Sequence, residues 1–401
     1  MPTSPAVPDG AFDFLCAGRI AFGCGRADEA GAIAAEFGRR ALLVTNAGEP
    51  GDGGPVDRLV EALSAAGVTC SVLAQRGEPT VADIERVVAA ARSVDCDVVV
   101  GLGGGSALDA AKATAALLTN AGGPLDYIEV VGLGRKITRP AAPWIALPTT
   151  AGTGAEVTKN AVIACPDHQV KASIRGEQLL ARAVVVDPEL AISVPPDVTA
   201  AAGMDALCQL IESYTSARAQ PMTDALVREG LGRAARSLRR AVADSADLLA
   251  RGDLALAAML SGIALTNAGL GAAHGFAGPL GGRLAAPHGA ICAALLPGVM
   301  RANVEALRAE SPAHPAAGRY AAVGRMLTGR ADLGDADAID AGIAFVANLA
   351  NDLPIRPLGE MGLTVEAIPA VIAQARKSSS MRYNPVALSD EAMAGILAAA
   401  I

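Results

Sequence analysis

Residues 98–112, VVVGLGGGSALDAAK, form the stretch that decides the fold of this chain. An apolar run typical of a buried strand leads into three consecutive glycines, and a helix-forming segment follows. Glycines let the backbone approach a pyrophosphate closely, and the N–H groups that begin a helix favour an anion. The motif is not a strict GxGxxG, because Ser106 replaces its last glycine. We predict a nucleotide-phosphate loop here, with a ligand-free strand-to-helix turn as the alternative.

Strand-like and amphipathic helical segments alternate on both sides of this loop, which predicts parallel βαβ units. The expected strands and helices are 41–46, 55–66, 68–73, 80–93, 144–149 and 183–187, with a hairpin over 161–174. Paired prolines at Pro195 and Pro196 end the alternation, and helical spacing dominates the remainder. The sequence therefore predicts an α/β dinucleotide-binding domain over residues 1–195 and an all-α domain over residues 196–401.

The composition restricts the class of protein. The 401 residues carry a net charge of −8, without the basic clusters that nucleic acids or anionic membranes require. Seven scattered cysteines include no CxxC pair, so we expect no disulfide framework or thiolate zinc site, and mostly small buried thiols. The N-terminal residues do not resemble a signal peptide, and we expect no membrane-spanning stretch. We therefore expect a soluble, cytoplasmic protein with a small-molecule partner.

A second loop, residues 147–158, places hydroxyls and glycines directly after a predicted strand. Its hydroxyl groups suit phosphate or ribose, and a capped loop without a ligand is an equally good interpretation. Asn46 ends the first predicted strand, where dinucleotide-binding folds often place an acid against the ribose 2′-hydroxyl. A neutral amide accepts either a hydroxyl or a phosphate there. The choice between NAD and NADP therefore stays open, and Asn46 is alternatively a turn residue.

Two histidines, His274 and His288, lie among small and apolar residues, where an imidazole needs a polar partner. Asp205 begins a polar helical stripe that continues with Gln209 and Glu212. A catalytic divalent metal needs about three N or O ligands and an open position, which one Asp and two His supply. The alternative is a solvated helix face and two histidines that do not meet.

These segments, in this order, resemble the iron-containing alcohol dehydrogenase family over nearly the whole chain. Residues 14–23 resemble the family's opening hairpin, residues 103–106 its diphosphate loop, and residues 148–154 its second nucleotide loop. The resemblance implies the dehydroquinate synthase-like architecture and NAD or NADP as the cofactor. The positions it assigns to cofactor binding are Gly103, Gly104, Gly105, Ser106, Asp109, Thr149, Thr150, Thr153 and Lys171. Asn46 joins these candidates because of its place at the end of the first predicted strand.

The resemblance also implies a metal site. Family members hold their metal with an Asp and a His four residues apart on one helix and with two later histidines. Asp205, His274 and His288 match three of these positions, so they are the expected catalytic ligands of Fe²⁺ or Zn²⁺. Gln209 occupies the fourth position and is a weaker donor than imidazole. Three ligands also suffice in the zinc site of the related glycerol dehydrogenases.

The expected reaction is hydride transfer between a nicotinamide and an alcohol, aldehyde or ketone, assisted by the metal. Gly278 stands where many members carry a further histidine near the substrate, and Phe276 is expected beside the substrate. The family suggests a homodimer or a larger homo-oligomer. Two alternatives stay open: a metal-independent NAD(P)H reductase resembling the maleylacetate reductases, and a nucleotide-binding protein without catalysis.

Overall fold

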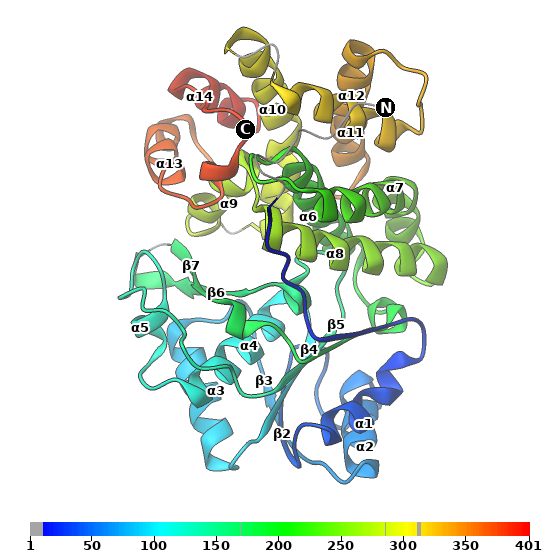
Figure 1. Ribbon diagram of the computed structural model, residues 1–401, viewed down its shortest axis with the longest axis vertical. Coiled ribbons are helices and arrows are strands. Elements are labelled where there is room, and N and C mark those ends of the chain that lie inside the picture. Colours follow the sequence, from blue (N-terminus) through cyan, green and yellow to red (C-terminus); the bar gives the residue numbers. More distant parts are fainter. Residues whose placement is uncertain (1–10, 169, 285, 311–313) are drawn as a thin grey trace. The chain divides into compact units, whose positions relative to one another are not determined.

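The computed structural model describes residues 11–168, 170–284, 286–310 and 314–401, which form two compact units (Figure 1). One unit comprises residues 15–194. The other comprises residues 195–401 together with the short segment 11–14. The division falls between Val194 and Pro195, whereas the segment 11–14 groups with the helical unit and not with the first domain of the sequence prediction. That residues 1–195 and 196–401 fold as separate domains stays a prediction.

A six-stranded parallel sheet forms the centre of the first unit. Its strand order is β1-β8-β5-β4-β2-β3, with the bounds β1 Arg19–Phe22, β2 Arg40–Thr45, β3 Thr69–Ala74, β4 Val98–Gly103, β5 Trp144–Pro148 and β8 Ala183–Val186. Every residue of β4, β5 and β8 is buried, because a parallel sheet is covered by helices on both faces. The predicted parallel α/β organisation is confirmed.

The helices of this unit are α1 Ala30–Ala35, α2 Pro55–Ala65, α3 Val81–Ser93, α4 Gly105–Thr119 and α5 Pro124–Tyr127. Thr80 caps α3, because its hydroxyl accepts from the N–H of Asp83 and the Asp83 carboxylate accepts from the N–H of Thr80. Short 3-10 helices are η2 Arg26–Glu29, η3 Ala155–Val157, η4 Pro166–His168, η5 Glu177–Leu179 and η6 Pro188–Ala191.

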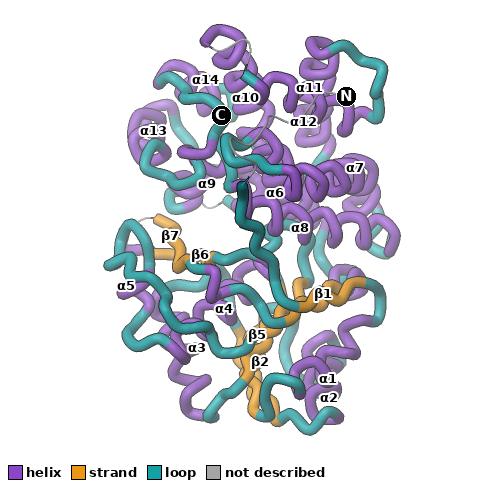
Figure 2. Tube along the Cα trace, in the orientation of Figure 1, coloured by secondary structure: helices purple, strands orange, loops and turns teal. Residues whose placement is uncertain are grey.

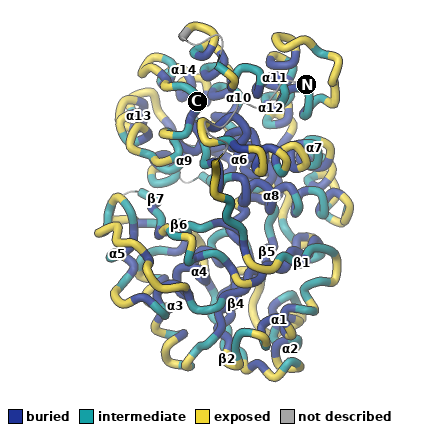
Figure 3. Tube along the Cα trace, viewed as in Figure 1, coloured by how far each residue is buried: buried dark blue, intermediate teal, exposed yellow. Residues whose placement is uncertain are grey.

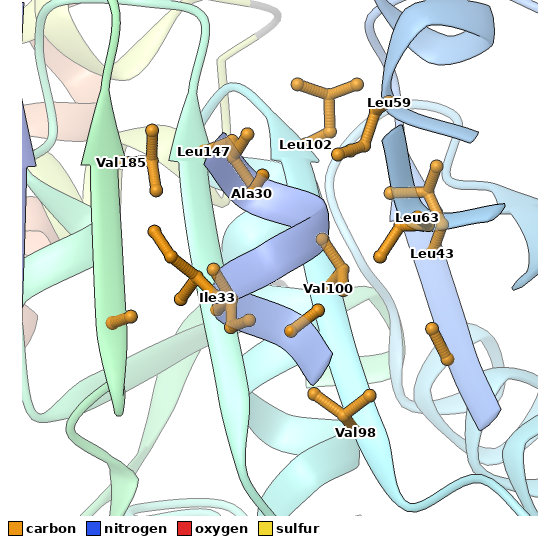
Figure 4. Close-up of a cluster of buried hydrophobic side chains, with 14 of the residues drawn as sticks. Ala30, Ile33, Leu43, Leu59, Leu63, Val98, Val100, Leu102, Leu147 and Val185 are labelled. Atoms are coloured by element: carbon orange, nitrogen blue, oxygen red, sulfur yellow. The ribbon is translucent and has the colours of Figure 1, made fainter. Parts of the chain in front are cut away.

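The two faces of β4 meet different helices, because successive side chains of a strand point in opposite directions. Val98, Val100 and Leu102 belong to the apolar cluster that includes Ile33 of α1 and Leu63 of α2 (Figure 4). On the other face, α4 lies so close that a Cβ on Gly101 would be 3.0 Å from the Ala111 side chain. The alternation within β4 therefore fixes where α4, and the loop before it, must lie.

Two hairpins were expected, and the structure contains one of them. The hairpin over 161–174 is present as β6 Asn160–Cys165 and β7 Val170–Arg175, which pair antiparallel. The hairpin expected over residues 14–23 is wrong, because β1 pairs in parallel with β8, with Arg19 opposite Ala183. Local patterning does not show a partner strand so distant in the sequence.

Among its described residues, the second unit consists of helices joined by turns and loops, without a strand (Figure 2). Its helices are α6 Pro196–Thr215, α7 Pro221–Ala243, α8 Leu248–Ala268, α9 Ala272–Gly281, α10 His288–Glu310, α11 Pro315–Thr328, α12 Asp335–Asp352, α13 Ile368–Ala375 and α14 Asp390–Ala398, with 3-10 turns η7 Val365–Ala367 and η8 Met381–Tyr383. The α6 helix is buried along most of its length (Figure 3) and packs against α7, α8 and α10. Apart from Asp197 in the exposed first turn, the polar residues of α6 are therefore buried and require partners.

Two helices of this unit are long and apolar enough to cross a membrane by length and composition alone: Leu248–Ala268 and residues 288–309 of α10. These two helices therefore reach an apolar length that was not expected from the sequence. About two thirds of each apolar window is buried inside the unit, 67% and 61% respectively. Burial in a helical core accounts for the apolar character of both helices.

Candidate functional site

The glycine loop lies between β4 and the first turn of α4. Gly103 ends β4 with a backbone φ of +152°, which an L side chain rarely adopts. A Cβ atom on Gly103 would also lie 2.0 Å from Oδ1 of Asn46. No side chain among the described residues caps α4, whose first turn contains Gly105 and Ser106. The N–H groups of this turn are therefore suited to an anion.

The second loop packs directly on the glycine loop. A Cβ atom on Gly104 would lie 3.2 Å from the hydroxyl of Thr150, and one on Gly105 would lie 2.9 Å from the hydroxyl of Thr153. The N–H of Thr149 donates to the carbonyl of Gly103 at 2.9 Å. The two nucleotide loops that the sequence singled out therefore form one continuous surface of backbone and hydroxyl groups.

Asn46 holds this surface from the end of β2. Its Oδ1 accepts a hydrogen bond from the N–H of Gly104 at 3.0 Å, while its side chain remains exposed to solvent. The contact is with the loop backbone, so Asn46 shapes the glycine loop. A contact between Asn46 and a ribose stays a prediction.

Two charged residues of α4 are buried beneath the loops. Lys112 donates to the Thr158 hydroxyl at 2.8 Å and to the Asn160 carbonyl at 2.7 Å. The carboxylate of Asp109 accepts from the N–H of Val162 at 3.1 Å and lies 3.5 Å from the Lys112 amine. Both side chains therefore hold β6 against α4. These contacts support a structural role for Asp109, and its predicted contact with the cofactor stays a prediction.

Glu156 of η3 is a third buried charge in this region. Burial raises the pKa of Glu156 to about 7, although the nearby Lys112 amine lowers it. The single ammonium group of Lys112 lies near two carboxyl groups, Asp109 and Glu156, and cannot neutralise both. The neutral form of Glu156 is therefore favoured.

Lys171 of β7, another predicted cofactor residue, is engaged in an ion pair. Its Nζ lies 2.6 Å from Oε1 of Glu78, and only 11% of the lysine side chain is exposed. The predicted contact with the cofactor stays a prediction, and it would compete with Glu78.

The helical unit brings the three predicted metal ligands together from three helices. Nε2 of His274 on α9 lies 3.2 Å from Oδ1 of Asp205 on α6, and Nε2 of His288 on α10 lies 3.9 Å from the same oxygen. The two imidazole centroids are 5.4 Å apart. Asp205 and His274 are buried, while 35% of the His288 side chain is exposed. The alternative of two histidines that do not meet is therefore excluded.

Glu212, two turns after Asp205 on α6, orients His274. Its Oε2 lies 2.7 Å from Nδ1 of His274, and its Oε1 accepts from the N–H of Ala273 at 2.6 Å. A carboxylate facing Nδ1 favours the tautomer whose proton is on that nitrogen. Nε2, the other ring nitrogen, faces Asp205 and is the one that a metal would bind.

Gln209 contacts the opposite side of Asp205. Its Nε2 donates to Oδ2 of Asp205 at 3.1 Å, and its Oε1 accepts from the Ser261 hydroxyl at 2.7 Å. Both histidines face Oδ1 of the carboxylate, so Gln209 lies outside the group of converging donor atoms. In this geometry the amide orients Asp205 and does not add a ligand to the cluster.

Residues 17–188 match the family model for iron-containing alcohol dehydrogenase, and residues 199–401 match the C-terminal model of the same family. The chain belongs to the iron-containing alcohol dehydrogenase family. It is an oxidoreductase of the alcohol dehydrogenase type. A choline dehydrogenase from Bacillus subtilis is 35% identical over 378 residues, covering 93% of this chain and 91% of that protein.

Solved structures agree with this assignment. A 1,3-propanediol oxidoreductase superposes with a TM-score of 0.89 at 32% identity, covering 98% of this chain and 100% of the other. A sulfoacetaldehyde reductase from Bifidobacterium kashiwanohense, solved in complex with NAD⁺, superposes with a TM-score of 0.83 at 28% identity over 97% and 98% of the two chains. The predicted fold class, an α/β unit followed by an all-α unit, is confirmed.

The ligand cluster of this alcohol dehydrogenase contains a cysteine that the sequence did not single out. Cys292 lies one turn after His288 on α10, and its Sγ is 3.7 Å from Nε2 of His274. One donor atom from each of Asp205, His274, His288 and Cys292 lies within 4.8 Å of the others. The spacing of four residues from His288 places Cys292 on the same helix face, which is the signal that could have found it.

The cluster is strongly polarised. Burial opposes protonation of His274, but the negative charge of Cys292 and the hydrogen bond to Asp205 raise the pKa of the imidazole well above 6.5. Burial alone would raise the pKa of Cys292, but a hydrogen bond with Cys208 and the positive charge of the imidazoles hold that pKa well below 9.0. The donor types that meet here, carboxylate oxygen, cysteine sulfur and imidazole nitrogen, are ones that bind divalent cations once the imidazoles have released their protons.

The two residues expected beside the substrate differ in their surroundings. A Cβ atom added to Gly278 would have no atom of the described residues within 4 Å, so this glycine borders open space in that part of the chain. The ring of Phe276 is completely buried and offers no surface to a substrate. A role for Gly278 near the substrate fits the structure, and a contact between Phe276 and substrate is an unsupported prediction.

Proposed function

We propose that this chain catalyses the reversible transfer of a hydride between a nicotinamide dinucleotide and a small alcohol, aldehyde or ketone. The convergence of Asp205, His274 and His288 from three helices carries the proposal. These side chains would hold a divalent metal, Fe²⁺ or Zn²⁺. Bound there, the metal supplies Lewis acidity toward a carbonyl or alkoxide oxygen.

The other residues of the cluster position the ligands. Glu212 fixes the ring of His274 through Nδ1, and Gln209 fixes the carboxylate of Asp205 through Oδ2. Partners of this kind keep ligands oriented and typically change metal affinity or activity 10- to 100-fold when removed, to an order of magnitude. Gln209 in the usual histidine position is therefore compatible with a metal enzyme.

The loops Gly103–Ser106 and 148–154 would bind the diphosphate and ribose of the cofactor. Their support is the uncapped first turn of α4 and the adjoining threonine hydroxyls. The complex of sulfoacetaldehyde reductase with NAD⁺ supports a nicotinamide dinucleotide. Asn46 carries no charge that would select between NAD and NADP.

Proton transfer needs a path that does not use an imidazole at position 278. Gly278 borders open space, so we propose that water or a ribose hydroxyl of the cofactor moves the proton there. We further propose a cytoplasmic homodimer or larger homo-oligomer, to be checked by light scattering of the purified chain.

The test combines elemental analysis with the variant His274→Ala. The wild type should contain about one Fe²⁺ or Zn²⁺ per chain and oxidise NAD(P)H with aldehydes, and His274→Ala should lose the metal and at least about 100-fold in kcat/KM. His168→Ala, which changes an exposed histidine in η4, is the matched control. Full activity of His274→Ala, or of chelated metal-free enzyme, would instead select the metal-independent reductase. Tight NAD(P)H binding without turnover would select the inactive nucleotide-binding protein.

A further inference from the structure

Cys292 lies at a distance from His274 that binding of both side chains to one metal would require. A tetrahedral site with bond lengths of ~2.0 Å to N or O and ~2.3 Å to S places N and O ~3.3 Å apart and N and S ~3.5 Å apart. The observed separations are 3.2 Å and 3.9 Å from Oδ1 of Asp205 to the two histidines, and 3.7 Å from Cys292 Sγ to Nε2 of His274. The separation of Cys292 Sγ from Nε2 of His274 is thus close to the tetrahedral value, the separation of His288 from Asp205 is wider, and all four donor atoms lie within 4.8 Å of one another.

The second buried cysteine near His274 shows by contrast why the position of Cys292 matters. Cys208 on α6 lies 3.8 Å from Nδ1 of His274, the nitrogen that faces Glu212. Cys292 lies on the side of Nε2, together with Asp205. One imidazole cannot bind a metal through Nε2 and bring Cys208 into the same coordination sphere.

Gln209 does not compete with Cys292 for the fourth position. Its amide nitrogen donates to Oδ2 of Asp205, whereas both histidines contact Oδ1, and its amide oxygen accepts from Ser261. To become a ligand, the side chain would have to leave both partners. Cys292 needs no such change, because its sulfur already faces the other three donor atoms.

We propose that the Cys292 thiolate is the fourth protein ligand of the metal, in place of the histidine that Gln209 has replaced. This inference rests on the proposed metal site and adds a sulfur ligand to it, which affects which metal the site prefers. A soft sulfur donor beside two imidazoles and a carboxylate favours zinc over iron more than an all-N,O set does. Cys292 thus raises the affinity of the site for zinc relative to its affinity for iron.

The first test uses unmodified protein. X-ray absorption at the zinc edge of the zinc-loaded wild type should show one sulfur scatterer at ~2.3 Å beside N and O scatterers at ~2.0 Å. Only N and O scatterers in protein that binds one zinc per chain would overturn the inference and leave the proposed function intact. Failure of the wild type to bind any divalent metal would overturn both.

The second test uses cobalt as a spectroscopic probe. Wild type loaded with Co²⁺ should show a thiolate-to-cobalt charge-transfer band in the near ultraviolet, which Cys292→Ser should lose and Cys208→Ser should keep. Cys292→Ser should still bind Co²⁺ through Asp205, His274 and His288, and its ratio of zinc to iron affinity should fall at least about 10-fold. Persistence of the band in Cys292→Ser, or its loss only in Cys208→Ser, would contradict the assignment.

Discussion

The two candidate sites of this enzyme are built in opposite ways. The nucleotide loops present backbone and hydroxyl groups. The charged side chains beneath them, Asp109 and Lys112, form hydrogen bonds that hold β6 against α4. The cluster in the helical unit presents side chains, and its backbone serves only to carry them. The candidate dinucleotide site therefore depends on glycines that leave the backbone accessible. The candidate metal site depends on side chains from different helices whose donor atoms converge.

Gly103→Ala should break the nucleotide surface and have the largest effect. The positive φ and the clash with Asn46 should together lower the free energy of unfolding by about 3 kcal/mol and abolish measurable NAD(P)H binding. Denaturant unfolding and fluorescence titration measure both quantities. Gly134→Ala is the control, because Gly134 has a positive φ but open space around its Cβ, and it should cost only about 1 kcal/mol. Equal losses in the two variants would refute the role of the clash.

Glu156→Gln should remove a buried carboxyl group beneath the loops that lacks a cation of its own. Because folding raises the pKa of Glu156 from 4.5 to about 7, its neutral form stabilises the wild type fully below pH 4.5, and this stabilisation is lost as the pH rises through 7. Glutamine is neutral throughout. The variant should therefore match the wild type near pH 4.5 and exceed it by about 3 kcal/mol at pH 8.

Urea unfolding at several pH values measures this difference. Glu61→Gln, which changes an exposed residue of α2, is the matched control and should show no such divergence. A constant difference between Glu156→Gln and wild type across the pH range would show that Glu156 does not change its ionisation on folding in this way.

Glu212→Gln should weaken the side-chain site without removing a ligand. Loss of the carboxylate facing Nδ1 of His274 should lower metal affinity about 10- to 100-fold, measured by competition with a chelator, and excess metal should restore activity. Glu229→Gln on the exposed face of α7 is the control. Unchanged affinity in Glu212→Gln would mean that the tautomer of His274 is set by another group.

Gly278→His should have the smallest effect on stability, within about 0.5 kcal/mol, because its Cβ meets open space. It should add a titrating group near pH 6.5 to the profile of kcat/KM. Gly275→His on the same helix is the contrasting variant, since its Cβ would lie 2.8 Å from Cε of Met381, and it should be clearly destabilised. A pH profile identical to wild type would exclude position 278 from the proton path.

The contrast between the backbone loops and the side-chain cluster also explains which features could be predicted from the sequence. The glycine loop and the capped helix α3 follow local rules, so their positions were predicted to within one or two residues of their observed bounds. The parallel pairing of β1 with β8 was missed because its two strands are separated by most of the first unit. Cys292 was assigned to the small buried thiols because its relation to His274 exists only after α9 and α10 have packed.

By itself, the sequence determined the parallel α/β unit, the helical unit and the three residues Asp205, His274 and His288. Those features depend on strand and helix periodicity, on glycine at a fixed point, and on the order of motifs along the chain. The tertiary structure alone decided that Gln209 turns toward Ser261 and that Cys292 joins the donor atoms. Both depend on distances between side chains of different helices, and no spacing within a single segment encodes such distances.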